Sequence, residues 1–203
     1  MMRVSSRVSG KLHRLWVFSI VLLLAATVSP PSASGADNAK EKEKARADIV
    51  KMSDATLSRL YQAQPKAKTA IANAAGYAVF SNFGMKILVT GGGSGKGVAV
   101  NNATKKKTYM KMIEVQAGLG IGIKKFRLVW VFEKQKDLDA FINSGWELGA
   151  QTTAAAQAGG QGASLAGAMS VAPGIWVYQL TDDGLAAELT AKGTKYYKDG
   201  DLN

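Results

Sequence analysis

The run from Gly91 to Lys96 is the part of this sequence that comes nearest to a phosphate-binding motif. The phosphate-binding loop of nucleotide-hydrolysing enzymes requires Gly at the position of Thr90 and Ser or Thr at the position of Gly97. It also requires a helix next, because helix amide groups bind the phosphate, whereas Val98 begins a run typical of a strand. We therefore interpret the glycines as a turn between two strands, with Lys96 exposed at that turn.

Histidine and cysteine are nearly absent from the chain, which removes many catalytic mechanisms. The 203 residues include one histidine, His13, and no cysteine. His13 lies in a segment that we expect to be removed. Ser-His-Asp triads, cysteine nucleophiles, thiolate metal sites and disulfides are then excluded from the mature protein. Together with the spacing of the acidic residues, considered next, this leads us to predict no cofactor, no metal site and no catalytic residue.

Carboxylates are the remaining candidates for catalysis, and their spacing is not that of a catalytic pair. Asp137 and Asp139 do not face each other on a helix, and the Asp182-Asp183 pair suits a turn. An enzyme that uses carboxylates alone stays open as an alternative, since paired acids can hydrolyse glycosidic bonds. It would require Glu133 and Glu147 to converge in a cleft. We expect the protein not to be an enzyme.

Clusters of basic residues are the clearest chemical signal. One cluster, Lys105–Lys107, lies in a connection between strands, and a second, Lys124–Arg127, lies at the next strand junction. If those strands pair antiparallel, the two clusters form one basic edge, which suits anionic lipid headgroups. The alternative is that the lysines only prevent edge-to-edge association of exposed strands. The predicted lipid-binding residues are Lys96, Lys105, Lys106, Lys107, Lys111, Lys124, Lys125 and Arg127.

The N-terminal segment, residues 1–36, is typical of a secretory signal peptide. Four basic residues precede an apolar run from Leu15 to Val28, which is short for a membrane span, and small residues end the segment. We expect cleavage after Ala36, with Ala33 as the second choice. Losing those four basic residues lowers the net charge from +11 to +7. We expect a basic periplasmic or secreted protein that, without any cysteine, is not a lipoprotein.

Helical patterns precede the strands. Residues 37–48 form a charged tail or the start of a helix, and apolar residues then recur at helical spacing. Pro65 begins a second, alanine-rich helix, and a third, short helix is expected near residue 140. The first helix either contacts a membrane with its apolar face or simply covers the sheet. The residues of that apolar face are Ile49, Met52, Leu57, Leu60 and Tyr61.

Five runs rich in Val, Ile and aromatic residues predict strands between Gly76 and Glu133. Alternating glycines at 118–122 leave one strand face bare, which permits tight coiling of the sheet or close packing of another element. A strand at 174–180 and a hairpin turn follow, whereas residues 146–158 receive no assignment. We predict an α+β fold in a single domain, residues 49–203. A strongly curved antiparallel sheet, approaching a barrel, is covered by N-terminal helices and one short later helix.

Short motifs between Leu57 and Asp199 occur in a characteristic order. They are Pro65, Ala74–Phe80, Gly93–Val98, Gly118–Gly122, Tyr178, Gly184–Leu189 and Tyr196-Tyr197. No single motif is specific, but their order over this length resembles the SYLF domain family, also called the Ysc84 family of actin-binding and lipid-binding domains. A signal peptide without an SH3 or zinc-finger domain is similar to the bacterial exported branch.

The resemblance implies binding without catalysis. Eukaryotic members bind phosphoinositide-containing membranes and in some cases actin filaments, and we do not expect an exported bacterial protein to meet either in its own cell. We predict non-enzymatic binding of anionic phospholipid, or of another envelope polyanion, at a membrane surface. The alternative is a protein-interaction or envelope-stress module in the periplasm, with a protein partner and no lipid. No nucleic acid partner is expected, because aromatic residues are few.

Overall fold

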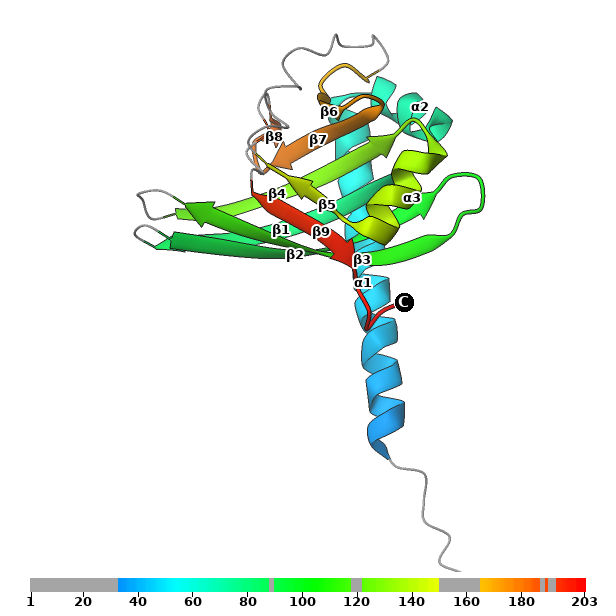
Figure 1. Ribbon diagram of the computed structural model, residues 1–203, viewed down its shortest axis with the longest axis vertical. Coiled ribbons are helices and arrows are strands. Elements are labelled where there is room, and N and C mark those ends of the chain that lie inside the picture. The colour runs from blue at the N-terminus through cyan, green and yellow to red at the C-terminus, as the bar shows by residue number, and fades with distance from the viewer. Residues whose placement is uncertain (1–32, 88–89, 118–121, 150–164, 187–188, 190–192) are drawn as a thin grey trace, which may run out of the picture. The chain divides into compact units, whose positions relative to one another are not determined.

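The computed structural model describes residues 33–203, apart from residues 88–89, 118–121, 150–164, 187–188 and 190–192 (Figure 1). Contacts divide the chain into two units, residues 1–33 and residues 34–203. The described helices and strands lie in the second unit, except that the first helix begins at Ala33. Most of the predicted signal peptide and of the bare face at Gly118–Gly122 therefore lies outside the described residues.

The described part of the chain contains three helices. They are α1 (Ala33–Ala63), α2 (Lys66–Asn73) and α3 (Gln135–Ser144). Pro65 precedes α2 with a φ of −57°, which suits the start of a helix. Gly145 ends α3 with a φ of 77°, a left-handed conformation that glycine adopts easily. None of these helices is both long enough and apolar enough to span a bilayer.

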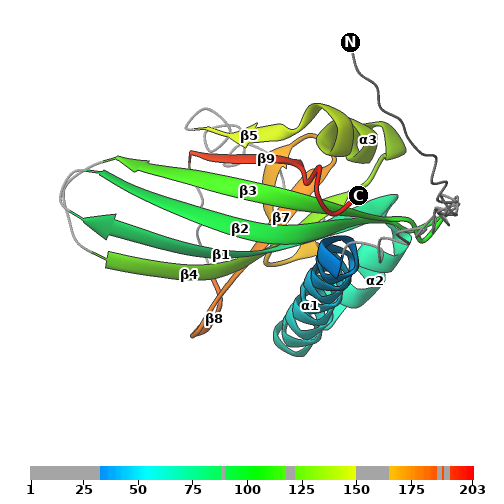
Figure 2. The same ribbon diagram turned by 90° about the horizontal axis from the view of Figure 1, so that it is seen from below.

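The described strands form one antiparallel sheet of nine strands. They are β1 (Gly76–Ile87), β2 (Thr90–Asn101), β3 (Lys107–Ala117), β4 (Gly122–Phe132), β5 (Trp146–Leu148), β6 (Met169–Ala172), β7 (Ile175–Thr181), β8 (Gly184–Leu185) and β9 (Thr194–Lys198). Their order is β5-β9-β3-β2-β1-β4-β7-β6, with β8 beside β7. The sheet curves strongly and is nearly closed into a barrel, with helices against it (Figure 2). The predicted α+β fold is confirmed.

The glycine run from Gly91 to Gly97 lies inside β2, so the turn predicted there is wrong. A Cβ atom on Gly97 would overlap the ring of Phe80, and one on Gly95 would overlap the side chain of Met112. Large side chains from both neighbouring strands therefore fill the space above the bare inner face of β2. Close packing, and not a change of chain direction, explains these glycines.

Aromatic rings fill the inside of the curved sheet. Trp130 and Tyr196 have ring centroids 4.9 Å apart, and Phe80 lies 4.9 Å from the same tyrosine. Phe141 of α3 closes this cluster at 5.1 Å from Trp130. Edge-to-face and tilted rings at these distances are the favoured arrangements of aromatic pairs. Tyr196 lies in β9, a strand that was not predicted from the sequence and that inserts between β5 and β3.

Helix α1 crosses the outer face of the sheet, on the side opposite α3 (Figure 2). Leu57 and Leu60 are buried in a cluster with Val79 and Val129 of the sheet. Each fully buried side chain of this size stabilises the fold by about 1.5–3 kcal/mol. Ile49 is also buried, and Met52 and Tyr61 pack partly against the same clusters. Of the two alternatives for this helix, membrane contact and covering of the sheet, its burial supports the second.

Candidate functional site

Cross-strand register places side chains from several strands in one line on the outer face of the sheet. Ser81 of β1 lies opposite Lys96 of β2 and opposite Arg127 of β4. Lys96 in turn lies opposite Lys111 of β3. Opposite residues in antiparallel strands have Cβ atoms about 5 Å apart on one face, so these side chains are neighbours. We call this line the basic row; it consists of Tyr197, Lys111, Lys96, Ser81, Arg127 and Leu180.

A second line lies two residues farther along each strand and on the same face. Phe83 is 50% exposed and Ile113 is 41% exposed, and they are the large apolar side chains that stay exposed in the part of the chain that the structure describes. Small Ser94 lies between them. Apolar side chains grouped on a surface and bordered by polar ones mark interaction sites. We call this line the exposed row; it consists of Lys195, Ile113, Ser94, Phe83 and Lys125.

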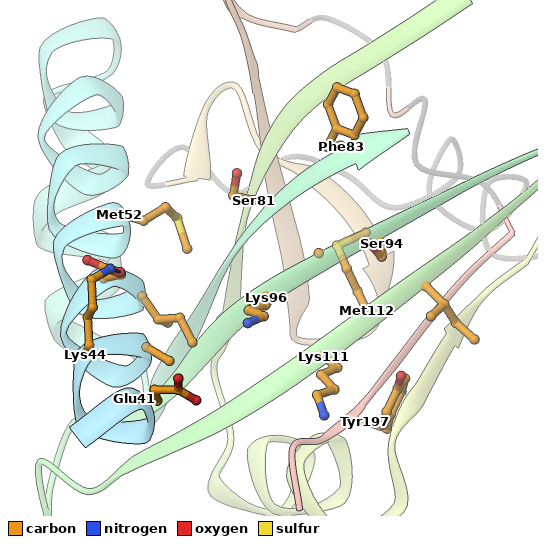
Figure 3. Close-up of a pocket in the computed structure, with 15 residues that line it drawn as sticks. Glu41, Lys44, Met52, Ser81, Phe83, Ser94, Lys96, Lys111, Met112 and Tyr197 are labelled. Atoms are coloured by element: carbon orange, nitrogen blue, oxygen red, sulfur yellow. Dashed lines mark hydrogen bonds and ion pairs between the residues drawn. The ribbon is translucent and has the colours of Figure 1, made fainter. Parts of the chain in front are cut away.

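A groove separates the N-terminal half of α1 from the two rows. Its volume is about 660 Å³. Figure 3 shows Lys44 and Met52 on the helix side, with Lys96 and Phe83 on the strands across from them. Helix α1 packs on the sheet around Leu60 and again around Ala45 and Ile49, and the groove runs beside these contacts. The row members that line the groove and are exposed there are Phe83, Ser94, Lys96 and Ile113.

Lys111 is the member of the basic row whose charge is already neutralised. Its Nζ lies 2.9 Å from a carboxylate oxygen of Asp199 and 2.9 Å from one of Asp201. Hydrogen bonds to these two carboxylates raise the pKa of Lys111 above its usual value. Lys111 therefore contributes mainly to joining β3 to the C-terminal residues.

The other lysines of the two rows form no ion pair in the part of the chain that the structure describes, although Glu147 of β5 lies opposite Lys195. Among the ion pairs of the described residues, none involves Lys96, Lys125 or Lys195. All three side chains are exposed. The Lys125 Nζ lies 5.8 Å from the centre of the Phe83 ring, a cation–π distance. The face therefore combines unpaired positive charge with exposed apolar surface.

The predicted single basic edge is wrong, because β3 and β4 do not pair. They are separated by β2 and β1 in the sheet order. Residues 105–107 lie at the β2–β3 connection. Ile113 of the exposed row lies six positions beyond Lys107 along β3, which corresponds to about 20 Å. The structure instead brings Lys96, Lys111 and Arg127 together in the basic row and places Lys125 in the exposed row. The side chain of Lys124 lies outside the described ones.

The acids named as catalytic candidates do not assemble into a pair. Glu133 accepts a hydrogen bond of 2.9 Å from Trp176 Nε1 beside the end of β4. Glu147 lies in β5 opposite Lys195, and β9, β3, β2 and β1 separate β5 from β4 in the sheet order. Glu114 is buried inside the sheet, where its Oε2 accepts a hydrogen bond of 2.6 Å from Asn82. The cleft that a carboxylate-only enzyme requires of Glu133 and Glu147 is not formed.

Four members of the exposed row, namely Phe83, Ser94, Ile113 and Lys195, were not singled out from the sequence. Alternation along β1 places Phe83 on the same face as Ser81 and Val79, so its face was readable once the strand was recognised. The neighbours of Phe83 in the row could not be predicted, because they depend on how five strands pair. The register is a tertiary property.

Comparisons with known proteins give a family and a relative. Residues 113–203 match the sequence model of the Ysc84 family, which is described as "Las17-binding protein actin regulator". Beta cell expansion factor A from Aeromonas veronii is 38% identical over 165 residues, which cover 81% of this chain and 61% of that protein. The chain thus spans less than two thirds of the length of this curated relative.

Proposed function

Because residues 113–203 of this chain belong to the Ysc84 (SYLF) family, we propose that the protein binds membranes containing anionic lipid through the basic row and the exposed row. The observation that carries the proposal is the exposed row, in which Phe83 and Ile113 lie between Lys125 and Lys195. Apolar side chains on such a face enter the headgroup region, while each cationic group near the surface contributes about 1 kcal/mol. The proposed role is non-enzymatic.

Net charge supports an anionic partner. The whole chain carries +11, and +7 would remain after removal of the predicted signal peptide. A basic protein is attracted over long range to a negatively charged surface, and this attraction weakens as salt is added. We place the interaction in the periplasm or outside the cell, since residues 1–36 have the features of a signal peptide. Anionic phospholipid or another envelope polyanion would supply the negative surface.

The second candidate is a protein-interaction module. The description of the Ysc84 family names a protein partner, and the exposed apolar side chains of Phe83 and Ile113 would equally suit a protein surface. In that case binding to lipid vesicles would be absent, and reversing the charge of the lysines would leave the function intact. The two candidates therefore differ in one measurable property.

The test is co-sedimentation of the protein with vesicles of phosphatidylcholine alone or of phosphatidylcholine mixed with phosphatidylglycerol, at low and high salt. We expect binding to the anionic vesicles only, weakened by salt. A Lys96→Glu, Lys125→Glu variant should lose most of this binding. A control variant with Lys105, Lys106 and Lys107 changed to Glu has a larger change in charge, but these residues lie at the far end of β3, so it should lose less binding. If both variants lose binding equally, total charge and not this face determines binding.

If the wild-type protein binds no vesicle, the protein-interaction role is favoured.

A further inference from the structure

A small basic hollow adjoins the groove described above. Its volume is about 190 Å³, and it is lined by residues of α1, β1 and β4 and by the end of β7. Ser81 and Phe83 line both this hollow and the groove of about 660 Å³. In Figure 3 these two residues lie next to each other on β1, at one end of the groove. The two hollows therefore share a wall on β1.

Three cationic side chains, Arg59, Lys125 and Arg127, line the small hollow. Arg59 donates a hydrogen bond of 2.8 Å to the carbonyl oxygen of Thr181, and Arg127 donates one of 3.3 Å to Oγ1 of Thr56. Both partners are neutral, so these bonds orient the guanidinium groups without neutralising them. Asp182 is the only carboxylate among the described lining residues. Three positive charges against one negative charge leave a net excess of two.

A phosphate group matches this excess. A phosphate monoester carries up to two negative charges near neutral pH, and arginine side chains bind phosphate oxygens through paired hydrogen bonds. A hollow of this size suits a headgroup and not a chain. The neighbouring groove is mixed in character: Met52, Phe83 and Ile113 supply apolar surface on its wall. Its charged lining residues are Glu41, Lys44, Asp48, Lys96 and Lys111. Its volume falls within the range of about 300–1,000 Å³ that is typical of ligand sites.

We propose that the two hollows together bind one molecule of a phosphate-headed lipid. The phosphate occupies the small basic hollow between Arg59, Lys125 and Arg127, and the acyl chain lies in the groove between α1 and the rows. This inference rests on the proposed function, because it uses the same face, and it goes beyond surface attachment. A site for one molecule binds monomeric lipid with a stoichiometry of one to one.

Calorimetric titration with lauroyl lysophosphatidic acid, below the concentration at which it forms micelles, tests the inference. We expect saturable binding of one molecule per chain. Inorganic phosphate and uncharged lauroyl monoglyceride should each bind at least about tenfold more weakly, since each lacks one half of the ligand. If inorganic phosphate binds as tightly, the hollow is a site for free phosphate and the inference is overturned. If the uncharged monoglyceride binds as tightly, the basic hollow recognises nothing and the inference is again overturned.

Two variants separate the halves of the site. Lys125→Gln removes one charge from the small hollow and should weaken lysophosphatidic acid binding by about tenfold. Lys136→Gln makes the same change on α3, outside both hollows, and should leave this binding unchanged. Ala45→Trp fills the groove from the side of α1 and should abolish binding of the lysolipid while the two rows remain intact. Binding that survives both Lys125→Gln and Ala45→Trp would overturn the proposed site.

Vesicle binding by the same proteins distinguishes failure of this inference from failure of the proposed function. If wild-type protein binds anionic vesicles but shows no one-to-one binding of lysophosphatidic acid, only the single-molecule site is overturned. If it binds neither, the membrane role fails as well. Circular dichroism of each variant confirms that the fold is retained.

Discussion

The Nζ atom of Lys111 lies 2.9 Å from Oδ1 of Asp199, and this ion pair connects β3 to the residue that follows β9. The side chain of Asp199 is only 2% exposed, whereas that of Asp201, the second partner of the same lysine, is 75% exposed. A buried carboxylate is costly unless it is paired. The pair therefore neutralises the buried carboxylate and adds to the backbone pairing of β9 with β3, although the sequence places Lys111 within a cluster of apparent surface charge.

Replacing Lys111 should destabilise the fold. In Lys111→Met the Asp199 carboxylate remains buried without its cation, and we expect the free energy of unfolding to fall by about 1–3 kcal/mol. Asp201→Asn is the matched control, because exposed ion pairs contribute little. Urea unfolding followed by circular dichroism measures both. Unchanged stability of Lys111→Met together with weakened vesicle binding would instead make Lys111 a lipid contact.

Adding a methyl group at Gly97 should also be harmful. The new Cβ atom would overlap the Phe80 ring inside the sheet, and overpacking of a filled core costs about 1–3 kcal/mol. Gly92→Ala is the control, because a Cβ at Gly92 would meet only the Glu114 carbonyl oxygen at 3.5 Å, an ordinary contact. Thermal unfolding compares the two variants. Equal melting temperatures would show that β2 needs no bare face at Gly97.

Two buried tyrosines predict alkaline unfolding. Burial raises the pKa of Tyr178 from its ordinary value of 10.0 to about 12, and burial also raises the pKa of Tyr196. The folded state therefore favours the neutral phenols, while the unfolded chain ionises near pH 10. Their contribution to stability is complete below about pH 10 and is lost as the pH rises through the folded-state values.

Absorbance at the tyrosinate band and far-ultraviolet circular dichroism, recorded across this pH range, test the prediction. Part of the tyrosinate signal should appear together with the loss of structure. In Tyr178→Phe that part should become smaller. If every tyrosine ionises near pH 10 while the protein stays folded, the buried positions of Tyr178 and Tyr196 are contradicted.

Phe83 should matter for membrane binding and little for folding. Its side chain is half exposed, so Phe83→Ser should change stability by no more than about 0.5 kcal/mol. At high salt the attraction of the lysines for the membrane is screened, and the apolar contact then supplies the remaining affinity. Losing a contact of about 1 kcal/mol would weaken binding roughly fivefold.

The measurement for Phe83 is vesicle co-sedimentation at high salt, with Phe83→Leu as an apolar control. Phe83→Leu should retain most of the binding that Phe83→Ser loses. Equal binding by wild type and Phe83→Ser would exclude an apolar contribution from this position.

Much of the fold could be predicted from local patterns. The helix that begins after Pro65, the short helix ended by Gly145 and the strand containing Tyr178 all appear where spacing and turn residues predicted them. The glycines at 91–97 were misread, because a turn and a bare strand face use the same residue. No strand was predicted for the residues of β9, because Lys, Tyr and Thr in so short a segment show no distinctive alternation of polar and apolar residues.

The basic character of the candidate site was predicted from the sequence, but the positions of its residues relative to one another were not. Composition alone indicated a basic protein in which neither histidine nor cysteine occurs after residue 36. The position of the charges depended on strand order. Since β3 and β4 lie apart in the sheet, Lys107 and Lys125 are separated, whereas Lys96 and Arg127 become near neighbours of Ser81.

The sequence by itself determined which elements form, because hydrophobic periodicity, glycine and proline act within a few residues. It also determined which chemistry is available, because the chemical type of each side chain does not depend on the fold. The tertiary structure decided which charges are free and which apolar side chains are exposed. Lys111 is neutralised by Asp199, some ninety residues later in the chain. Phe83 and Ile113 lie on either side of Ser94 only through strand pairing. Long-range register sets both relations, since it brings together residues that no local pattern connects.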